Sequence, residues 1–424
     1  MGGTAASHRI LRRLGLGIFK LLIPNEEVED LTRQWYPQMR RRALTVGSLL
    51  GLLMVAQLEK VTGAVDELLS RGWGRVRQTY GLSHVARPVT RQAFSKRLKT
   101  LPWEIFRGLL GVLCSAGGDL WHPAEGLQQG VYTIQAIDGS VVNVAARLVK
   151  AWAGMPGRGG KVGRKAQAKV HMMFNVSLGI PTMITVTGAR RSELRQARKL
   201  VQQAVKRGPT IFVTDLGYFS FEFFYRLTEA GAFFVARLKE RTKYQRVKKL
   251  GRRDWLVRVG ITAKTQRTIV VRLVVVREGK EIYRYLTNLM PEQGFARADI
   301  RSLYRKRWLV ELFFKAWKHV LEGGRFFCYN TNGIKIQIYA SLCAYVLVRM
   351  LVEQAARRYR FDARLVGFQR TAAIVRCWMY QHWESLWSLR PRRRVLDRLL
   401  QQIAILGRAL ARSEISKKGQ KRRA

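Results

Sequence analysis

The sequence predicts an α/β protein in which a mixed β-sheet flanked by helices lies between two helical regions. β-Branched, alternating segments gather between residues 131 and 290, which is the pattern of strands. Amphipathic segments alternate with strands after Ser192, which favours a sheet covered by helices. Residues before 130 and after 334 instead carry apolar side chains at helical spacing.

Charge gives the first indication of function. The chain has 424 residues with 77 Lys and Arg against 28 Asp and Glu, a net charge of +49 and a pI near 11.3. Such self-repulsion favours a polyanionic partner, above all nucleic acid. Hydrophobic residues make up 47%, which allows a sizeable core and excludes wholesale disorder.

The four cysteines form no CxxC pair, which argues against a zinc site or a disulfide framework and fits a reduced cytoplasm. The longest charge-free stretch of the N-terminal region, residues 43–58, is shorter than the ~20 residues that a membrane span needs. We therefore expect a buried helix there, and no membrane partner.

Residues 1–130 are predicted to form a helical, basic DNA-binding region. Thr90 can cap a basic helix on which Phe94 and Leu98 face inward. Such a helix could enter a DNA major groove or could simply be a solvated amphipathic helix, and both interpretations stay open. Its polar face would carry Arg91, Gln92, Ser95, Lys96, Arg97 and Lys99.

Residues 131–240 are predicted to form the first part of a catalytic core. The Gly-rich basic segment at residues 154–165 lacks the Ser or Thr that a phosphate loop places after its lysine, so we interpret it as a DNA-facing loop. Strands are expected at residues 131–138, 169–175, 181–187, 210–214 and 232–238, with helices at 192–207 and 221–230.

The next segment, residues 241–294, alternates basic and β-branched residues and is predicted to be an inserted antiparallel β unit. In residues 295–333 one long core helix should run from an N-cap at Asp299 to Leu321. Residues 334–424 should be helical and end in a disordered basic tail after Ser416.

Two of the scarce acids stand where predicted strands end. Asp138 is followed at once by Gly139, and Asp215 is followed two residues later by Gly217. Active sites of open α/β sheets collect at strand ends, although either residue alone could be an ordinary turn or cap residue.

A third acid lies on the predicted long helix. Tyr304, Arg307, Glu311 and Lys318 share a stripe about 60° wide at about 100° per residue. A salt-bridged exposed face would explain the Arg307–Glu311 spacing, but not a lone acid on a basic, aromatic helix. Three carboxylates from three segments can hold divalent metals for phosphodiester cleavage. Arg307 and Lys318 would then grip phosphates, and Tyr304 would donate a hydroxyl.

The pattern Tyr-x2-Arg-x3-Glu-x6-Lys from Tyr304 to Lys318 resembles the signature of insertion-sequence DDE transposases of family four, the cut-and-paste type. The segments around Asp138 and Asp215 resemble that family's two aspartate motifs, and the three acids are 77 and 96 residues apart.

This resemblance implies an RNase H-like catalytic core with the β-strand insertion, in which Asp138, Asp215 and Glu311 are catalytic metal ligands. It implies two Mg²⁺ ions, for which Mn²⁺ can substitute. It also implies double-stranded DNA partners (transposon ends and target DNA), a homodimer in the DNA complex and a bacterial, nucleoid-associated location. Cleavage would pass through a hairpin on the transposon end.

Relatives in the family also stack a flipped base on an aromatic side chain of the β insertion. Tyr283 or Tyr285 could serve, although cross-strand packing would explain either one as well. His171, beside two methionines on a predicted strand, is expected to be a packed core histidine rather than a ligand.

Two rival functions remain at this stage. An RNase H-like nuclease or resolvase would keep the three acids but would need neither the Tyr304–Lys318 stripe nor the β insertion. A domesticated, non-catalytic DNA-binding protein would tolerate the loss of the acids, which are intact here.

Overall fold

The computed structural model describes residues 25–38, 44–61, 64–79, 88–120, 132–155, 165–205, 208–260, 268–387 and 395–407. The chain divides into two compact units. The helical unit spans Met1–His122, Val144–Leu148 and Lys315–Ala424, and the sheet unit spans Pro123–Asn143 and Val149–Phe314. The basic tail and most of the Gly-rich loop lie outside the described residues.

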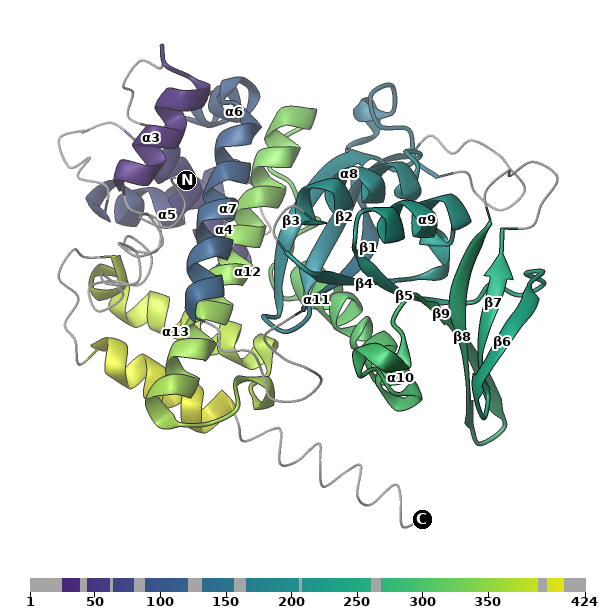
Figure 1. The fold of residues 1–424 in the computed structure, drawn as a ribbon. Helices are drawn as coiled ribbons and strands as arrows, with labels where there is room; N and C mark the ends of the chain where they lie inside the picture. The colour runs from purple at the N-terminus through teal and green to yellow at the C-terminus, as the bar shows by residue number, and fades with distance from the viewer. Residues whose placement is uncertain are drawn as a thin grey trace. The chain divides into compact units, whose positions relative to one another are not determined.

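The sheet unit contains, in its described part, one nine-stranded sheet in the order β3-β2-β1-β4-β5-β9-β8-β7-β6 (Figure 1). β4 and β5 run parallel to β1, and the strands from β9 onward are antiparallel, so the sheet is mixed as predicted. The order β3-β2-β1-β4-β5 is that of an RNase H-like core. The strands are β1 (Thr133–Val144), β2 (Ala166–Asn175), β3 (Ile180–Gly188), β4 (Thr210–Thr214), β5 (Phe233–Arg237), β6 (Gln245–Gly251), β7 (Asp254–Val259), β8 (Ile269–Glu278) and β9 (Glu281–Thr287).

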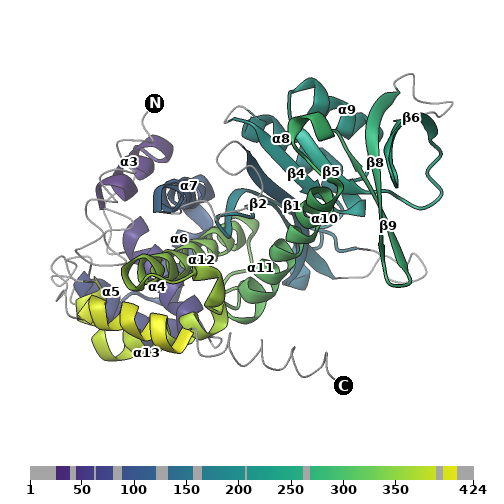
Figure 2. The ribbon, with the colours of Figure 1, turned by 60° about the horizontal axis from the view of Figure 1, so that its bottom comes forward.

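Helices cover both faces of this sheet (Figure 2). On one face, α8 (Glu193–Val205) and α9 (Phe221–Glu229) bury an aromatic core in which Phe224 stacks on Phe234 with ring centroids 4.4 Å apart. On the other face lie α10 (Arg297–Lys306) and α11 (Trp308–His319), where Phe313 meets Phe174 at 5.3 Å. The predicted fold class, a mixed sheet flanked by helices, is confirmed.

The four strands β6–β9 form the antiparallel insertion, and β9 joins it to the core sheet through β5. A buried ion pair fixes its base. Arg272 Nη2 lies 2.6 Å from Asp254 Oδ2, and Arg272 Nη1 donates to the Phe295 carbonyl at 2.7 Å. Because Phe295 leads into α10, this arginine ties the insertion to the helix that precedes Glu311.

The helical unit is built around α12 (Thr331–Tyr359), which packs on α7 (Trp103–Leu120) and α4 (Val46–Leu58). By length and composition α12 could cross a membrane, but 89% of its most apolar window is buried inside the protein, as in a core helix. The buried helix predicted at residues 43–58 is confirmed as α4, every residue of which is buried. The other helices are α3 (Asn25–Trp35), α4 (Val46–Leu58), α5 (Val65–Thr79), α6 (Arg91–Thr100), α7 (Trp103–Leu120) and α13 (Phe368–Trp387), and residues 395–407 are also helical.

The structure corrects the single long helix predicted from Asp299 to Leu321. Two helices take its place, and Arg307 separates them. The helical hydrogen-bond pattern is interrupted there, because the N–H of Arg307 donates to the Tyr304 carbonyl, three residues back, at 3.1 Å. The first begins at Arg297. Asp299 is therefore not the N-cap but lies in the first turn, where its carboxylate accepts the Ala296 N–H at 2.8 Å.

Two further corrections concern single residues. Asp138 does not end its strand, since β1 continues to Val144. Arg97 does not decorate the exposed face of α6, because it is buried and its Nε donates to the Leu44 carbonyl at 2.9 Å. The rest of that prediction holds, with Thr90 as N-cap and Phe94 buried.

Candidate active site

Asp138 and Asp215 lie side by side on neighbouring parallel strands. Ile137 of β1 pairs with Thr214 of β4, so the next residues of the two chains, the aspartates, are at the same register. Asp215 keeps an extended backbone (φ −83°, ψ 170°). Because side chains alternate along a strand and Ile137 belongs to the core under α8 and α9, both aspartates face the α10 and α11 side.

Helix α11 supplies the third carboxylate on that side. Glu311 lies in its first turn and forms a short ion pair with Arg307, at the break between the helices. Arg307 is largely buried, with 14% of its side chain exposed, against 33% for Glu311. The i, i+4 spacing thus places a largely buried cation next to the acid.

The electrostatics link the three acids to one another. Burial raises the pKa of Asp138 to about 6; the Gly139 N–H and Arg307 lower that pKa, while Asp215 and Glu311 raise it. The Gly139 N–H donates to Asp138 Oδ1 at 2.7 Å. Burial and the charges of two other acids disfavour ionisation of Asp138. A bound cation would favour its ionised form, so this environment suits cation binding.

Tyr304 and Arg307 complete this side of the site. Burial lowers the pKa of Arg307, but Asp215 and Glu311 raise it by more than burial lowers it. The net shift of this pKa is therefore upward. Burial raises the pKa of Tyr304, and Asp215 adds to that. The Arg307 guanidinium lies 5.8 Å from the centre of the Tyr304 ring. Lys318, in contrast, lies in the helical unit, two turns beyond Glu311 on α11.

Oxygen-only donors from three segments suit a hard divalent cation. In the described part of the chain, however, no three His, Cys, Asp or Glu side chains lie close enough together to bind one ion. The donor chemistry and charge fit a divalent metal at Asp138, Asp215 and Glu311. In this structure the Glu311 carboxylate is engaged by its ion pair with Arg307.

Sequence reasoning missed three residues on the opposite face, behind Asp138: Lys169, Glu193 and Tyr218. Lys169 and Glu193 form a short ion pair, and Tyr218 is buried beside them. Tyr218 follows the second aspartate in the motif, but no sequence pattern indicates that Lys169 pairs with Glu193, 24 residues later in the chain. His171, nearby on β2, is a packed core histidine as expected: its Nε2 lies 2.9 Å from Thr187 Oγ1, and burial lowers its pKa to about 4.

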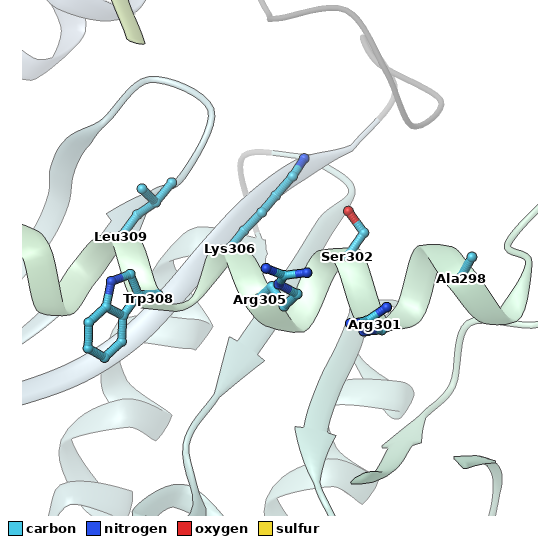
Figure 3. A pocket seen from close by; sticks show the side chains of 7 residues that line it. All are labelled: Ala298, Arg301, Ser302, Arg305, Lys306, Trp308 and Leu309. Atoms are coloured by element: carbon cyan, nitrogen blue, oxygen red, sulfur yellow. The ribbon is translucent and has the colours of Figure 1, made fainter. Parts of the chain in front are cut away.

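The outward face of α10 and α11 is hollowed and cationic (Figure 3). The hollow has a volume of about 390 Å³, and Trp308 at its rim is 56% exposed. Its lining consists of Ala298, Arg301, Ser302, Arg305, Lys306, Trp308 and Leu309.

Comparison with known proteins agrees with this geometry. The family model described as the transposase DDE domain matches residues 129–347, more than half of the chain and all of the candidate acids. The chain belongs to the DDE transposase family. It is therefore a DNA-cleaving and strand-transferring enzyme that acts with divalent metal.

Relatives of this transposase come from bacterial insertion sequences, which confirms the resemblance inferred from the Tyr304–Lys318 spacing. The probable transposase for element IS5377 of Geobacillus stearothermophilus is 26% identical over 65% of this chain and 71% of its own. The putative transposase for element IS4SA of Synechocystis is 27% identical over 61% and 71%. Transposase InsG for element IS4 of Escherichia coli is 24% identical over 49% and 50%.

Among solved structures, a piggyBac transposase synaptic complex with hairpin DNA is 11% identical to this transposase. It aligns over 91% of this chain and 84% of that chain with a TM-score of 0.45.

Proposed function

We propose that this transposase binds the ends of its element, cleaves them with two Mg²⁺ ions held by Asp138, Asp215 and Glu311, and joins the element to target DNA. The observation that carries the proposal is the shared register of the two aspartates on the face that also carries Glu311. Mn²⁺, which accepts similar oxygen ligands, is expected to substitute.

Divalent ions held by these carboxylates would supply Lewis-acid chemistry for activating the attacking oxygen and neutralising charge on the leaving oxygen. The protein's part is to orient the acids. β1 and β4 fix Asp138 and Asp215 at one register, and the Gly139 N–H holds one oxygen of Asp138. Glu311 sits on a helix and can change rotamer without disturbing the sheet.

Arg307 and Glu311 exchange partners when DNA binds. In the free protein Arg307 neutralises Glu311, and Asp215 and Glu311 raise the pKa of Arg307. A guanidinium carries more N–H donors than one carboxylate engages and matches phosphate geometry. An incoming phosphate would draw Arg307 away and leave Glu311 free for metal. DNA and metal would then bind cooperatively.

Of the two candidates for stacking a flipped base, Tyr283 is the better placed. Tyr285 is buried, 3% exposed, with its ring centre 5.0 Å from that of Tyr304. Tyr283 is only partly buried, stacks on Tyr285 at 6.4 Å and has the Arg237 guanidinium 5.5 Å from its ring centre. A base stacked there would lie beside a cation that can hold its phosphate.

DNA beyond the cleaved end would follow the cationic hollow of α10 and α11 (Figure 3). Arg305 and Lys306 can bind phosphates, and the exposed Trp308 offers an apolar face to a sugar or base. We expect two copies of the chain to pair two element ends in the bacterial cytoplasm, because excision needs both ends to be cut.

The test is end cleavage by Asp138→Asn, Asp215→Asn and Glu311→Gln with Mg²⁺. Each variant should bind an end duplex normally and leave it uncut, because the amides lose metal affinity but keep size and hydrogen bonds. Glu222→Gln, which alters an exposed ion pair on α9, is the matched control and should cut normally. Cleavage by any of the three at the control's rate would remove that residue from the site.

The same gel separates the transposase from a simple nuclease. A transposase converts the first nick into a hairpin and then into a joined target product. A nuclease would stop at nicked or fully cut DNA. If the wild-type protein never yields a joined product, the nuclease hypothesis is favoured.

A further inference from the structure

A compact polar cluster lies on the face of the sheet opposite the catalytic aspartates. Lys169 projects from β2, Glu193 is the first residue of α8, and Tyr218 ends the short 3-10 turn after Asp215. The Lys169 side chain is 9% exposed and forms a short ion pair with Glu193. These residues come from three segments, and the function proposed above uses none of them.

The Glu193 carboxylate lies between the two glycines that follow the catalytic aspartates. A Cβ on Gly217 would lie 2.6 Å from Glu193 Oε2, and a Cβ on Gly139 would lie 3.6 Å from Glu193 Oε1. One carboxylate therefore faces both segments, with one oxygen toward each. The absence of a side chain at Gly217 is what makes this approach possible.

Lys169 and Tyr218 close the same space. A Cβ on Gly139 would lie 3.1 Å from Lys169 Cε and 3.3 Å from the Tyr218 hydroxyl oxygen. Side chains alternate along β1, so the missing side chain of Gly139 would point away from the face that carries Asp138. The cluster is thus packed directly behind the peptide that follows the first aspartate.

The Tyr218 hydroxyl adds a second, independent observation. Tyr218 is 2% exposed, and its hydroxyl has no hydrogen-bond partner among the described residues. Burial raises the pKa of Tyr218, and Glu193, Asp138 and Asp215 each raise it further. A buried hydroxyl without a partner is a donor held ready for a nearby acceptor, since buried polar groups are normally paired.

Building on the proposed function, we propose that Glu193, anchored by Lys169, is a positioning residue for Asp138 and Asp215, and that the Tyr218 hydroxyl donates to this set of carboxylates when metal is bound. Glu193 touches neither DNA nor metal. It acts through the backbone of the Gly139 and Gly217 segments, whose separation sets the distance between the two aspartates.

The geometry distinguishes this role from that of an ordinary ion pair. A purely structural pair would need to approach only one neighbouring segment, whereas the Glu193 carboxylate lies close behind both glycines that follow the aspartates. Groups that orient metal ligands in this way typically contribute ~10–100-fold to metal affinity or activity. Loss of Glu193 should therefore weaken metal binding more than it weakens folding or DNA binding.

The experiment measures Mn²⁺ affinity by electron paramagnetic resonance on the full-length protein bound to an end duplex. Cleavage against Mg²⁺ concentration, duplex affinity and melting temperature are measured in parallel. Glu193→Gln and Tyr218→Phe are compared with the control Glu222→Gln, which removes the charge of a partly exposed acid paired with Arg226 at 2.7 Å. Glu193→Asp, one methylene shorter, tests whether reach matters.

Glu193→Gln should weaken Mn²⁺ binding ~10–100-fold and raise the half-maximal Mg²⁺ concentration equally, with saturating Mg²⁺ restoring most cleavage. Tyr218→Phe should show a smaller shift in the same direction, and Glu193→Asp should fall between Glu193→Gln and wild type. Should Glu193→Gln not fold, Tyr218→Phe, which keeps the ring, decides the question. Wild-type Mn²⁺ affinity in a folded Glu193→Gln or Tyr218→Phe protein overturns this inference but not the proposed function. If wild-type protein binds no Mn²⁺, the proposed function falls with it.

Discussion

The raised pKa of Asp138 makes the candidate active site a source of instability, which replacing this carboxyl with an amide can remove. Burial and the two neighbouring acids lift this pKa from 3.8 to about 6. One pKa unit corresponds to about 1.4 kcal/mol, so the ionised carboxylate costs about 3 kcal/mol in the folded protein. Asp138→Asn keeps the acceptor for the Gly139 N–H and cannot ionise.

The sign of the pH dependence follows from linkage. The folded protein holds the Asp138 proton more tightly than the unfolded chain, so the cost is fully present above pH 6 and vanishes below about pH 4. Asp138→Asn should therefore unfold at higher urea concentration than wild type at pH 7.5, by up to about 3 kcal/mol. The two proteins should converge as the pH falls to 4.

Urea unfolding without divalent ions, followed by circular dichroism from pH 4 to 8, measures this difference. Asp66→Asn is the control, since Asp66 is exposed and lies 3.9 Å from Arg91. Adding Mg²⁺ at pH 7.5 should stabilise wild type more than Asp138→Asn. A variant that is less stable than wild type at pH 7.5, or a difference that does not change with pH, would refute the electrostatic account of the site.

Three further predictions follow from the fold and the surface. Asp254→Asn, which leaves Arg272 buried beside a neutral side chain, should cost about 3–5 kcal/mol in urea unfolding; a loss below 1 kcal/mol would show that the pair does not hold the insertion. End binding should weaken steeply with salt, with a slope of about −0.9 per phosphate contact in a log–log plot from filter binding; a flat plot would assign the charge another purpose. Arg307→Ala and Lys318→Ala should keep nicking but accumulate the nicked duplex on a gel, because they lose phosphate contacts at the bent end, and normal hairpin yield would contradict this role.

Most of the fold could be predicted from local patterns. Buried strands such as β4, at Thr210–Thr214, match the prediction residue for residue, because a run of β-branched and aromatic residues between turn signals has one local solution. Asp138 was predicted to end its strand because the β-branched, alternating run stops there and Gly139 follows. The pairing of β1 with its neighbours carries the strand through that pair to Val144.

The break at Arg307 could not be predicted, because residues 304–311 contain no glycine or proline. It arises from two tightened turns, in which the Arg307 N–H donates to Tyr304 and the Val310 N–H donates to Arg307, both at 3.1 Å. Around it, Tyr304 packs on Tyr285 of the insertion and Arg307 pairs with Glu311. These are tertiary contacts, which leave no periodic signal.

The candidate acids could be found from the sequence because acidic residues are scarce in this chain. Asp138 and Asp215 are each followed closely by a glycine, and Glu311 lies in the Tyr304–Lys318 stripe. The Glu193 cluster was not, since its three members come from segments that meet only in the folded sheet. Gly139 and Gly217 were the available signals. Both were noted only as the glycines that follow the aspartates, whereas the structure shows that they leave room for another side chain.

The most direct test of the central claim, that these carboxylates bind the catalytic metal, is a change of metal preference. Asp138→Cys, Asp215→Cys and Glu311→Cys replace a hard oxygen ligand with sulfur, which Mg²⁺ binds poorly and Mn²⁺ tolerates better. Cleavage of an end duplex is measured in each metal, with Glu222→Cys as the control. We expect the three variants to be inactive in Mg²⁺ and to recover cleavage in Mn²⁺, while the control cuts in both. Cleavage in Mg²⁺ at the wild-type rate by any of the three would show that its carboxylate does not bind the metal.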